Sequence, residues 1–178
     1  MRVISGRLSG RTFESVPGHR THPMSEKMRG AIFNALGDIA GLTLLDAYAG
    51  TGAIAIEAIS RGAASAVALD SDKKAARTIQ ENIAQLGLEE QIRSSLIHAH
   101  SWSRRNQAEQ FDIVILDPPY DAVQPKELLQ LAGHCKPGGV IVLSLPPSNG
   151  FQYAPSARQL LNHKNYGDAG LQFYRQLH

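Results

Sequence analysis

The chain contains a single cysteine, Cys135, so no internal disulfide bond can stabilise it. Its hydrophobic runs all fall short of the roughly 18 residues that a membrane-spanning helix needs. Its first residues, 1–4, lack the apolar stretch of a signal peptide. These absences exclude a disulfide-stabilised secreted domain and predict a protein without a membrane partner. A lone thiol is typical of a reducing compartment, so we expect a cytoplasmic protein in which Cys135 is a buried bystander.

The chain also lacks an excess of either charge, because 18 basic and 16 acidic residues give a formal net charge of +2. The balance becomes informative when it is divided along the chain, since residues 1–29 hold six basic and two acidic residues. A basic terminus favours contact with a polyanion such as nucleic acid, although a solvated basic tail would have the same composition. The candidates for phosphate contact in this segment are Arg7, Arg11 and Arg20.

Length and composition predict one globular domain, with 178 residues of which 43% are hydrophobic. Apolar residues punctuated by glycines near the amino terminus predict two short strands joined by turns. We therefore divide the chain into a basic β-hairpin arm for RNA contact over residues 1–24 and a main domain over residues 25–178. We expect this protein to be a monomer.

The main domain alternates apolar runs of strand length with amphipathic segments of helix length. Helices are expected at 26–36, 53–61, 72–86, 126–132 and 156–162, strands at 42–47, 66–69, 92–97, 111–116 and 140–145, and a terminal hairpin across 166–177. This alternation predicts an α/β fold with a mostly parallel sheet covered by helices on both faces. Ligands of such sheets bind outside the carboxyl ends of the strands.

Three acidic residues lie at or near the carboxyl ends of predicted strands. Asp46 lies just inside the end of the first predicted strand, and Asp70 and Asp117 directly follow the second and fourth. Because parallel strands end at one edge of the sheet, we expect the three carboxylates to converge on a single site.

A glycine loop, Asp46-Ala47-Tyr48-Ala49-Gly50-Thr51-Gly52, joins the first core strand to the next helix. Glycines at two positions allow a tight turn and a close approach of backbone to a ligand. A dinucleotide site, a site for S-adenosylmethionine (SAM) and a turn without a ligand all fit this spacing. A carboxylate before the glycines would repel a pyrophosphate but could bind an ammonium group. SAM is therefore favoured over NAD, with Asp70 placed for its ribose hydroxyls.

The turn Asp117-Pro118-Pro119-Tyr120 directly follows a buried apolar run. Prolines fix φ and remove backbone donors, so the turn cannot continue the sheet and its carbonyls stay free to accept hydrogen bonds. A carboxylate, free carbonyls and an aromatic face together suit a flat substrate that bears an amino group. This turn therefore predicts amino methylation of a nucleobase, without separating guanine, adenine and cytosine.

The order of the glycine loop, the ribose-binding Asp70 and the Asp-Pro-Pro-Tyr turn resembles the class I SAM-dependent amino-methyltransferases, whose sheet is Rossmann-like. Three further segments, 5–11, 21–34 and 166–174, are similar to RsmD-type methyltransferases. That resemblance implies transfer of a methyl group to N2 of a guanine in small-subunit (16S) ribosomal RNA, with the ribosomal RNA or the small subunit as partner.

The resemblance and the motifs assign roles to individual residues. The expected catalytic residues are Asp117, Pro118, Pro119 and Tyr120. The expected SAM-binding residues are Asp46, Tyr48, Ala49, Gly50, Thr51, Gly52, Asp70, Ser71, His100, Ser101 and Asp117. Substrate RNA is expected to contact Arg7, Arg11, Arg20 and Tyr120. No metal is expected, because His98 and His100 are not accompanied by further ligands.

Two departures from the family pattern bear on substrate and cofactor recognition. The chain has His22-Pro23-Met24 where the family usually has Arg-Pro-Thr, and no acidic residue follows the third strand to face the adenine. Amino methylation of adenine or cytosine in DNA is an alternative, although no separate DNA-recognition domain is visible. A non-catalytic RNA-binding protein that keeps the fold is another alternative, and a dehydrogenase is a more distant one.

Overall fold

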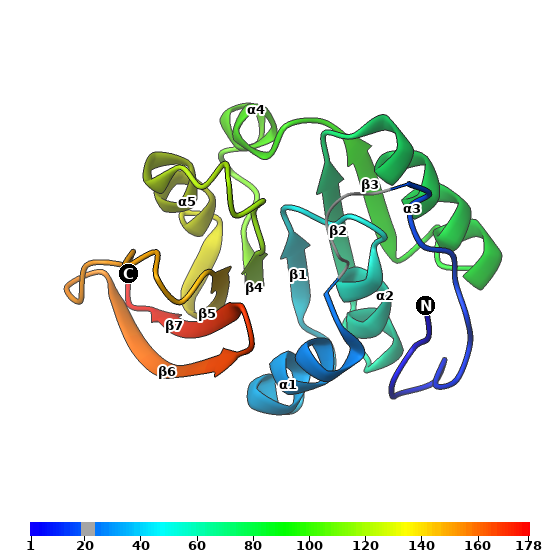
Figure 1. The fold of residues 1–178 in the computed structure, drawn as a ribbon, viewed down its shortest axis with the longest axis horizontal. Helices are drawn as coiled ribbons and strands as arrows, with labels where there is room; N and C mark the ends of the chain where they lie inside the picture. The colour runs from blue at the N-terminus through cyan, green and yellow to red at the C-terminus, as the bar shows by residue number, and fades with distance from the viewer. Residues whose placement is uncertain (19–23) are drawn as a thin grey trace.

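The computed structural model describes residues 1–18 and 24–178, which form one seven-stranded sheet covered by helices on both faces (Figure 1). The strands lie in the order β3-β2-β1-β4-β5-β7-β6. They span β1 Thr43–Asp46, β2 Ser65–Asp70, β3 Ile92–Leu96, β4 Phe111–Leu116, β5 Cys135–Leu145, β6 Arg158–Tyr166 and β7 Ala169–Gln176. The helices are α1 Glu26–Leu36, α2 Ala53–Ser60, α3 Lys73–Leu86, α4 Ala99–Arg105 and α5 Pro125–Ala132.

Strands β1 to β5 pair in parallel, and the β6–β7 hairpin joins the edge of β5 in antiparallel register. The central strands β1 and β4 are nearly continuous apolar runs because both faces of the sheet are covered. This arrangement confirms the predicted fold class, a mostly parallel Rossmann-like sheet with a carboxyl-terminal antiparallel hairpin.

The helix boundaries follow capping residues that are visible in the sequence. Ser25 accepts a hydrogen bond from the backbone N–H of Met28 at the start of α1, and Asp72 does the same for Ala75 at the start of α3. Gly37 and Gly87, both at positive φ, follow the last residues of these two helices.

The sheet separates two hydrophobic cores. One lies under α1, α2, α3 and the amino-terminal segment, and the other lies under α4 and α5 on the opposite face (Figure 1). Trp102 and Cys135 belong to the second core. Burial raises the pKa of the Cys135 thiol to about 12, so this cysteine is an unreactive core residue, as predicted.

Three local predictions were wrong. Residues 156–162 were expected to be helical, but β6 begins at Arg158 and pairs with β7 along its length, so pairing overrides the local helical pattern. Strand β5 begins at Cys135 rather than Val140, with a register shift against β4 where a turn was expected. Helix α4 was missed, because its seven residues are too few to show a clear apolar period.

The amino-terminal segment 1–18 forms a single antiparallel bridge, Arg2 to Thr12, rather than the two short strands that we expected. Its apolar side chains Val3, Leu8 and Phe13 are buried in the same core as α2 and α3. The segment therefore packs as part of the main core and is not a solvated tail.

A buried carboxylate holds this segment in place. Glu57 on α2 is fully buried and accepts hydrogen bonds from the backbone N–H groups of Ile4 (2.9 Å) and Ser5 (3.0 Å). Arg61 donates to the same carboxylate at 2.8 Å, and the buried Arg29 lies 3.5 Å from it. Glu57 thus joins α1, α2 and the amino-terminal segment through one charged group.

The backbone of Gly6 lies directly against the carboxyl-terminal end of α2. A Cβ atom at this position would lie 1.9 Å from the backbone oxygen of Ser60, and the φ of Gly6 is +86°. The Ser60 hydroxyl in turn donates to the carbonyl of Ser5 at 2.5 Å and accepts from the N–H of Leu8 at 3.0 Å. Glycine at position 6 is required for this contact.

Candidate functional site

The three predicted carboxylates meet where the strand order reverses. Strand β1 lies between β2 and β4, and Asp46, Asp70 and Asp117 stand at or just beyond the carboxyl ends of these three strands. Asp70 and Asp117 both lie close enough to Asp46 for their negative charges to raise its pKa. The structure therefore brings the three side chains into one site, at the position where doubly wound sheets bind ligands.

Asp46 is buried, and one of its two carboxylate oxygens has no hydrogen-bond partner. It is 2% exposed, and its Oδ2 makes no hydrogen bond to any residue that the structure describes. Burial, and then the neighbouring Asp117 and Asp70, raise the pKa of Asp46 to about 8, and backbone N–H groups only partly oppose them. A buried, unpaired carboxylate oxygen in a cluster of like charge suits a cationic ligand.

The glycine loop lies directly beside this carboxylate cluster. Asp70 accepts a hydrogen bond from the N–H of Gly50 at 2.8 Å and another from the N–H of Asp72 at 2.8 Å. Gly50 has a positive φ, and a Cβ added there would meet no atom within 4 Å, so the loop leaves open space for a ligand. Gly52, in the left-handed conformation, turns the chain into α2.

Asn82 on α3 supports the glycine loop from below, and the sequence reasoning missed it. Its side chain is fully buried and donates to the carbonyls of Thr51 and Glu14, both at 3.0 Å, while its oxygen accepts from the N–H of Glu14 at 2.8 Å. One carboxamide thus connects the loop to the amino-terminal segment. The local sequence does not distinguish Asn82 from an exposed polar residue of a helix, because its partners are at least 31 residues away in the chain.

Tyr48 has its hydroxyl group in use within the protein. The hydroxyl donates to Glu127 on α5 at 2.8 Å, and burial together with Glu127 raises the pKa of Tyr48. This contact ties the glycine loop to α5. A direct contact of Tyr48 with SAM stays a prediction.

The Asp117–Tyr120 turn is anchored by a serine that the sequence reasoning also missed. Ser144, the single hydroxyl residue in the apolar run 140–145 of β5, lies 3.2 Å from the Tyr120 hydroxyl. Burial raises the pKa of Asp117 to about 6, and a hydrogen bond from Ser144 partly lowers it. Tyr120 keeps 37% of its surface exposed. Its ring is therefore held at one end and open to a flat ligand.

The residues after β3 lie somewhat apart from this cluster. Ala99 starts α4, so His100 and Ser101 belong to its first turn. His100 is exposed and lines a hollow between α4 and α5, and no described contact joins it to the carboxylates. Ser71 follows β2 and is exposed. Contacts of these three residues with SAM stay predictions.

The predicted RNA contacts are only partly within the described residues. Arg7 and Arg11 are exposed on the amino-terminal segment, and Arg7 donates to Gln91 at 2.5 Å. Arg20, together with the departure at His22 and Pro23, lies outside the described residues. In the described part of the chain, no group of three or more His, Cys, Asp or Glu side chains could hold a metal ion.

No helix within residues 1–18 and 24–178 is long and apolar enough to cross a bilayer.

The site fits an amino-acid-bearing nucleoside such as SAM. Asp46 offers an unpaired buried acceptor for an ammonium group, Gly50 leaves room for backbone contact, and Asp70 retains lone pairs beside the loop. With the strand order and the Asp117–Tyr120 turn, these features define a class I SAM-dependent methyltransferase.

Comparison with known proteins narrows this class to one family. The family described as Conserved hypothetical protein 95 matches residues 1–175, and the chain belongs to this family. It is 35% identical over 134 residues to Ribosomal RNA small subunit methyltransferase D of Buchnera aphidicola, covering 72% of this chain and 68% of that protein. The protein of the same name from Escherichia coli is 25% identical over 99% of this chain and 90% of its own length.

Solved structures show the same architecture. The yhhF protein of Escherichia coli superposes with a TM-score of 0.86 at 26% identity, covering 99% of this chain and 98% of its own. A conserved hypothetical protein of Streptococcus pyogenes gives a TM-score of 0.74 at 30% identity, covering 83% of this chain and 94% of that one. The fold extends over the whole of this chain in the first of these.

Proposed function

We propose that this protein transfers a methyl group from SAM to the exocyclic N2 amine of a guanine in small-subunit ribosomal RNA. One observation carries the proposal: the Asp117 carboxylate and the anchored Tyr120 ring stand at the same edge of the sheet as Asp46, whose Oδ2 is unpaired. The names of the relatives support ribosomal RNA as the substrate. Methylation of ribosomal RNA also implies work in the cytoplasm.

The residues that would hold SAM are those of the carboxylate cluster and the glycine loop. Asp46 would accept a hydrogen bond from the ammonium group, and Asp70 would bind the ribose hydroxyls. The backbone at Gly50 and Gly52 would lie close against the methionine part of SAM. When bound, SAM supplies an electrophilic methyl group on a sulfonium. Asn82 and the Asp70–Gly50 hydrogen bond keep the loop in one conformation, so little ordering is needed on binding.

The Asp117–Tyr120 turn would position the amine. The lone pair of guanine N2 is delocalised into the ring, so the group is a weak nucleophile that benefits from being held. Asp117 and the carbonyl of Pro118 would accept its two hydrogens and direct the lone pair out of the ring plane, toward the methyl group. The carboxylate also favours the positive charge that develops on the nitrogen. The proton can leave to water afterwards.

Tyr120 would bind the base itself. Its half-exposed ring is fixed through the Ser144 hydroxyl, so it offers a preformed stacking face. Stacking of a base on an aromatic ring contributes about 1–3 kcal/mol. A guanine within a helix would have to leave the stack to reach this turn.

The test of the function is to identify the methylated nucleoside. The protein is incubated with methyl-labelled SAM and, separately, with unmethylated small subunits, free ribosomal RNA and duplex DNA, and the product is digested and mapped. We expect label in N2-methylguanine from the RNA or subunit reactions. Label in N6-methyladenine or in DNA would refute the proposed substrate, and SAM binding without any transfer would favour a non-catalytic RNA-binding protein.

Affinity for SAM is expected to rise with pH to a maximum near pH 8. Because the pKa of Asp46 is about 8, the free protein holds this carboxyl protonated below that pH. An ammonium group at Oδ2 favours the carboxylate, so binding releases a proton and Kd falls by up to about tenfold per pH unit. Above about pH 8 the α-amino group of the cofactor loses its own proton and affinity declines again.

Calorimetry in buffers of different ionisation enthalpy, from about pH 6 to about pH 9, measures both the Kd and the released proton. Asp46→Asn should abolish the rising limb and the proton release, because its carboxamide does not titrate. The other groups that face Asp46 are Asp70 and Asp117. A Kd of the unchanged protein that stays constant below pH 8 would contradict the assignment of Asp46 to the ammonium group.

The amino-terminal segment is proposed to bind RNA phosphates through Arg7 and Arg11. Deleting the segment would remove buried apolar side chains and destabilise the core, so neutral substitutions make the cleaner test. The double substitution R7Q/R11Q is expected to weaken RNA binding by about tenfold and to reduce its salt dependence, with SAM affinity unchanged. The charge-matched control is R77Q/R93Q, at two exposed arginines elsewhere. Equal RNA affinities for the two doubles would rule out this role.

A further inference from the structure

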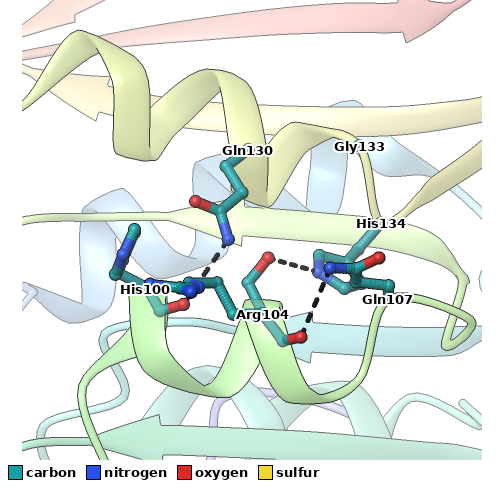
Figure 2. Close-up of a pocket in the computed structure, with 7 residues that line it drawn as sticks. His100, Arg104, Gln107, Gln130, Gly133 and His134 are labelled. Carbon is teal, nitrogen blue, oxygen red and sulfur yellow. Dashed lines mark hydrogen bonds between the residues drawn. The ribbon is translucent and has the colours of Figure 1, made fainter.

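A hollow of about 560 Å³ lies between α4 and α5, on the sheet face opposite the amino-terminal segment (Figure 2). Both walls follow directly from the catalytic edge, because α4 starts three residues after β3 and α5 starts five residues after Tyr120. The lining residues are His100, Ser103, Arg104, Gln107, Gln130, Gly133 and His134. None of the roles already assigned explains this hollow.

The lining offers hydrogen-bond donors and no carboxylate. Arg104 contributes a guanidinium, two carboxamides come from Gln107 and Gln130, and none of the seven residues is acidic. No described residue forms an ion pair with Arg104, so its guanidinium is available to a ligand. A guanidinium in a lining without carboxylates favours an anion over a cation.

Hydrogen bonds hold the imidazole of His134 in place at the floor of the hollow. His134 Nδ1 lies 2.7 Å from the carbonyl oxygen of Glu109, which can only accept, so Nδ1 donates. Nε2 lies 2.7 Å from the buried Ser103 hydroxyl, within hydrogen-bond distance. Trp102 packs against the imidazole with ring centres 5.0 Å apart. The part of the hollow formed by His134 is therefore held in one conformation.

The two carboxamides lie at the mouth and bridge neighbouring turns. Gln130 on α5 donates to the backbone carbonyl of His100 on α4 at 3.5 Å, and Gln107 donates to the carbonyl of Arg104 at 3.4 Å (Figure 2). Each carboxamide has a second N–H that these long contacts leave available. The guanidinium and these donors therefore line the same hollow and can each donate to an oxyanion bound there.

We infer that the hollow between α4 and α5 binds a backbone phosphate of the RNA substrate. This inference rests on the proposed function, and adds to it a second RNA contact on the far side of the catalytic edge. Lys126, which is exposed and lies one turn before Gln130 on α5, adds positive charge beside the hollow. RNA held on both faces of the sheet would straddle the Asp117–Tyr120 turn, which suits extraction of one base into the site.

The test compares two adjacent arginines. R104Q removes the guanidinium that lines the hollow, and R105Q is the matched control because Arg105 is an exposed neighbour that does not line it. Affinity for unmethylated small-subunit ribosomal RNA is measured at several salt concentrations, with SAM affinity and the unfolding midpoint as checks on each variant. We expect R104Q to weaken RNA binding by about three- to tenfold and to reduce the salt slope by about one, with a smaller effect for R105Q.

A second variant reverses the chemistry of the hollow without changing its shape. Gln130→Glu places a carboxylate opposite Arg104 and should lower RNA affinity at low salt, because the new charge repels phosphate and pairs with the guanidinium. Inorganic phosphate is titrated in parallel. An Arg104-dependent stabilisation by free phosphate, without an Arg104 effect on RNA, would assign the hollow to a small anion and overturn the inference.

The outcomes separate this inference from the proposed function. Equal RNA affinities and salt slopes for R104Q and R105Q, in a protein that still methylates guanine N2, would refute only the binding of RNA phosphate in the hollow. A wild-type protein that neither binds nor methylates the RNA would refute both. Normal methylation with an R104Q-specific loss of affinity would support both.

Discussion

Replacing Asp117 with alanine will reduce methyl transfer by about a thousandfold or more while SAM affinity changes only a few-fold. The substitution removes the acceptor that holds the amine and the charge that stabilises its cationic product, and positioning and electrostatics are the main sources of rate in such a site. Cofactor affinity is largely preserved because Asp46, rather than Asp117, is assigned to the ammonium group. Single-turnover transfer to RNA and calorimetric SAM binding measure the two effects separately.

The same residue should set the acid limb of the pH profile. Since the pKa of Asp117 is about 6, the carboxyl is protonated below that pH and donates where it should accept, so kcat/KM should fall as pH drops through 6. Ser144 lowers this pKa, so Ser144→Ala should move the limb to higher pH while leaving the plateau measurable. An Asp117→Ala protein with normal turnover, or an acid limb unmoved by Ser144→Ala, would refute the assigned role.

Replacing Glu57 with glutamine will lower the free energy of unfolding by about 3–5 kcal/mol, the usual effect of removing one partner from a buried ion pair. The carboxylate is fully buried against Arg29 and accepts from two backbone N–H groups of the amino-terminal segment. Burial lowers the pKa of Arg29, and Glu57 is the main group that opposes this shift. A neutral residue at position 57 leaves the guanidinium uncompensated.

Urea unfolding measures the loss, and hydrogen exchange at the amides of Ile4 and Ser5 localises it. Both amides should lose protection in Glu57→Gln, because their acceptor oxygens are replaced by a group that must also place two N–H donors. Glu81→Gln is the control, since Glu81 pairs with Arg77 on the exposed face of α3 and its loss should leave stability nearly unchanged. A Glu57→Gln protein as stable as this control would contradict the stabilising role assigned to Glu57.

Much of the fold could be predicted because its signals are local. Strands β1, β2 and β4 are short, mostly apolar runs. Helices α1 and α3 are bounded by Ser25, Gly37, Asp72 and Gly87 in the sequence itself. The errors lie where pairing decides the outcome. Strand β6 is exposed along most of its length and has no apolar pattern of its own, so its conformation depends on the ladder with β7.

The residues of the site also divide into those that the sequence predicts and those that only the fold reveals. Asp46, Asp70 and Asp117 could be found because each lies beside a strand end, and strand ends of a parallel sheet share one edge. Ser144, Asn82 and Glu57 could not be assigned from the sequence, because each acts on a partner at least 24 residues away in the chain. Nothing in the local sequence distinguishes them from ordinary polar residues of a strand or helix.

The amino-acid sequence by itself therefore determined the family, the order of the elements and the carboxylates and turn that carry the proposed chemistry. Glycines, prolines and capping side chains act on their immediate neighbours, so their effects can be inferred locally. Only the tertiary structure decided that the amino-terminal segment is locked to α2 and α3, and that Asp46 keeps a buried oxygen unpaired. It also placed the donor-lined hollow between α4 and α5. Burial and long-range pairing depend on which distant groups the folded sheet brings together, and these distances are not encoded in any short stretch of sequence.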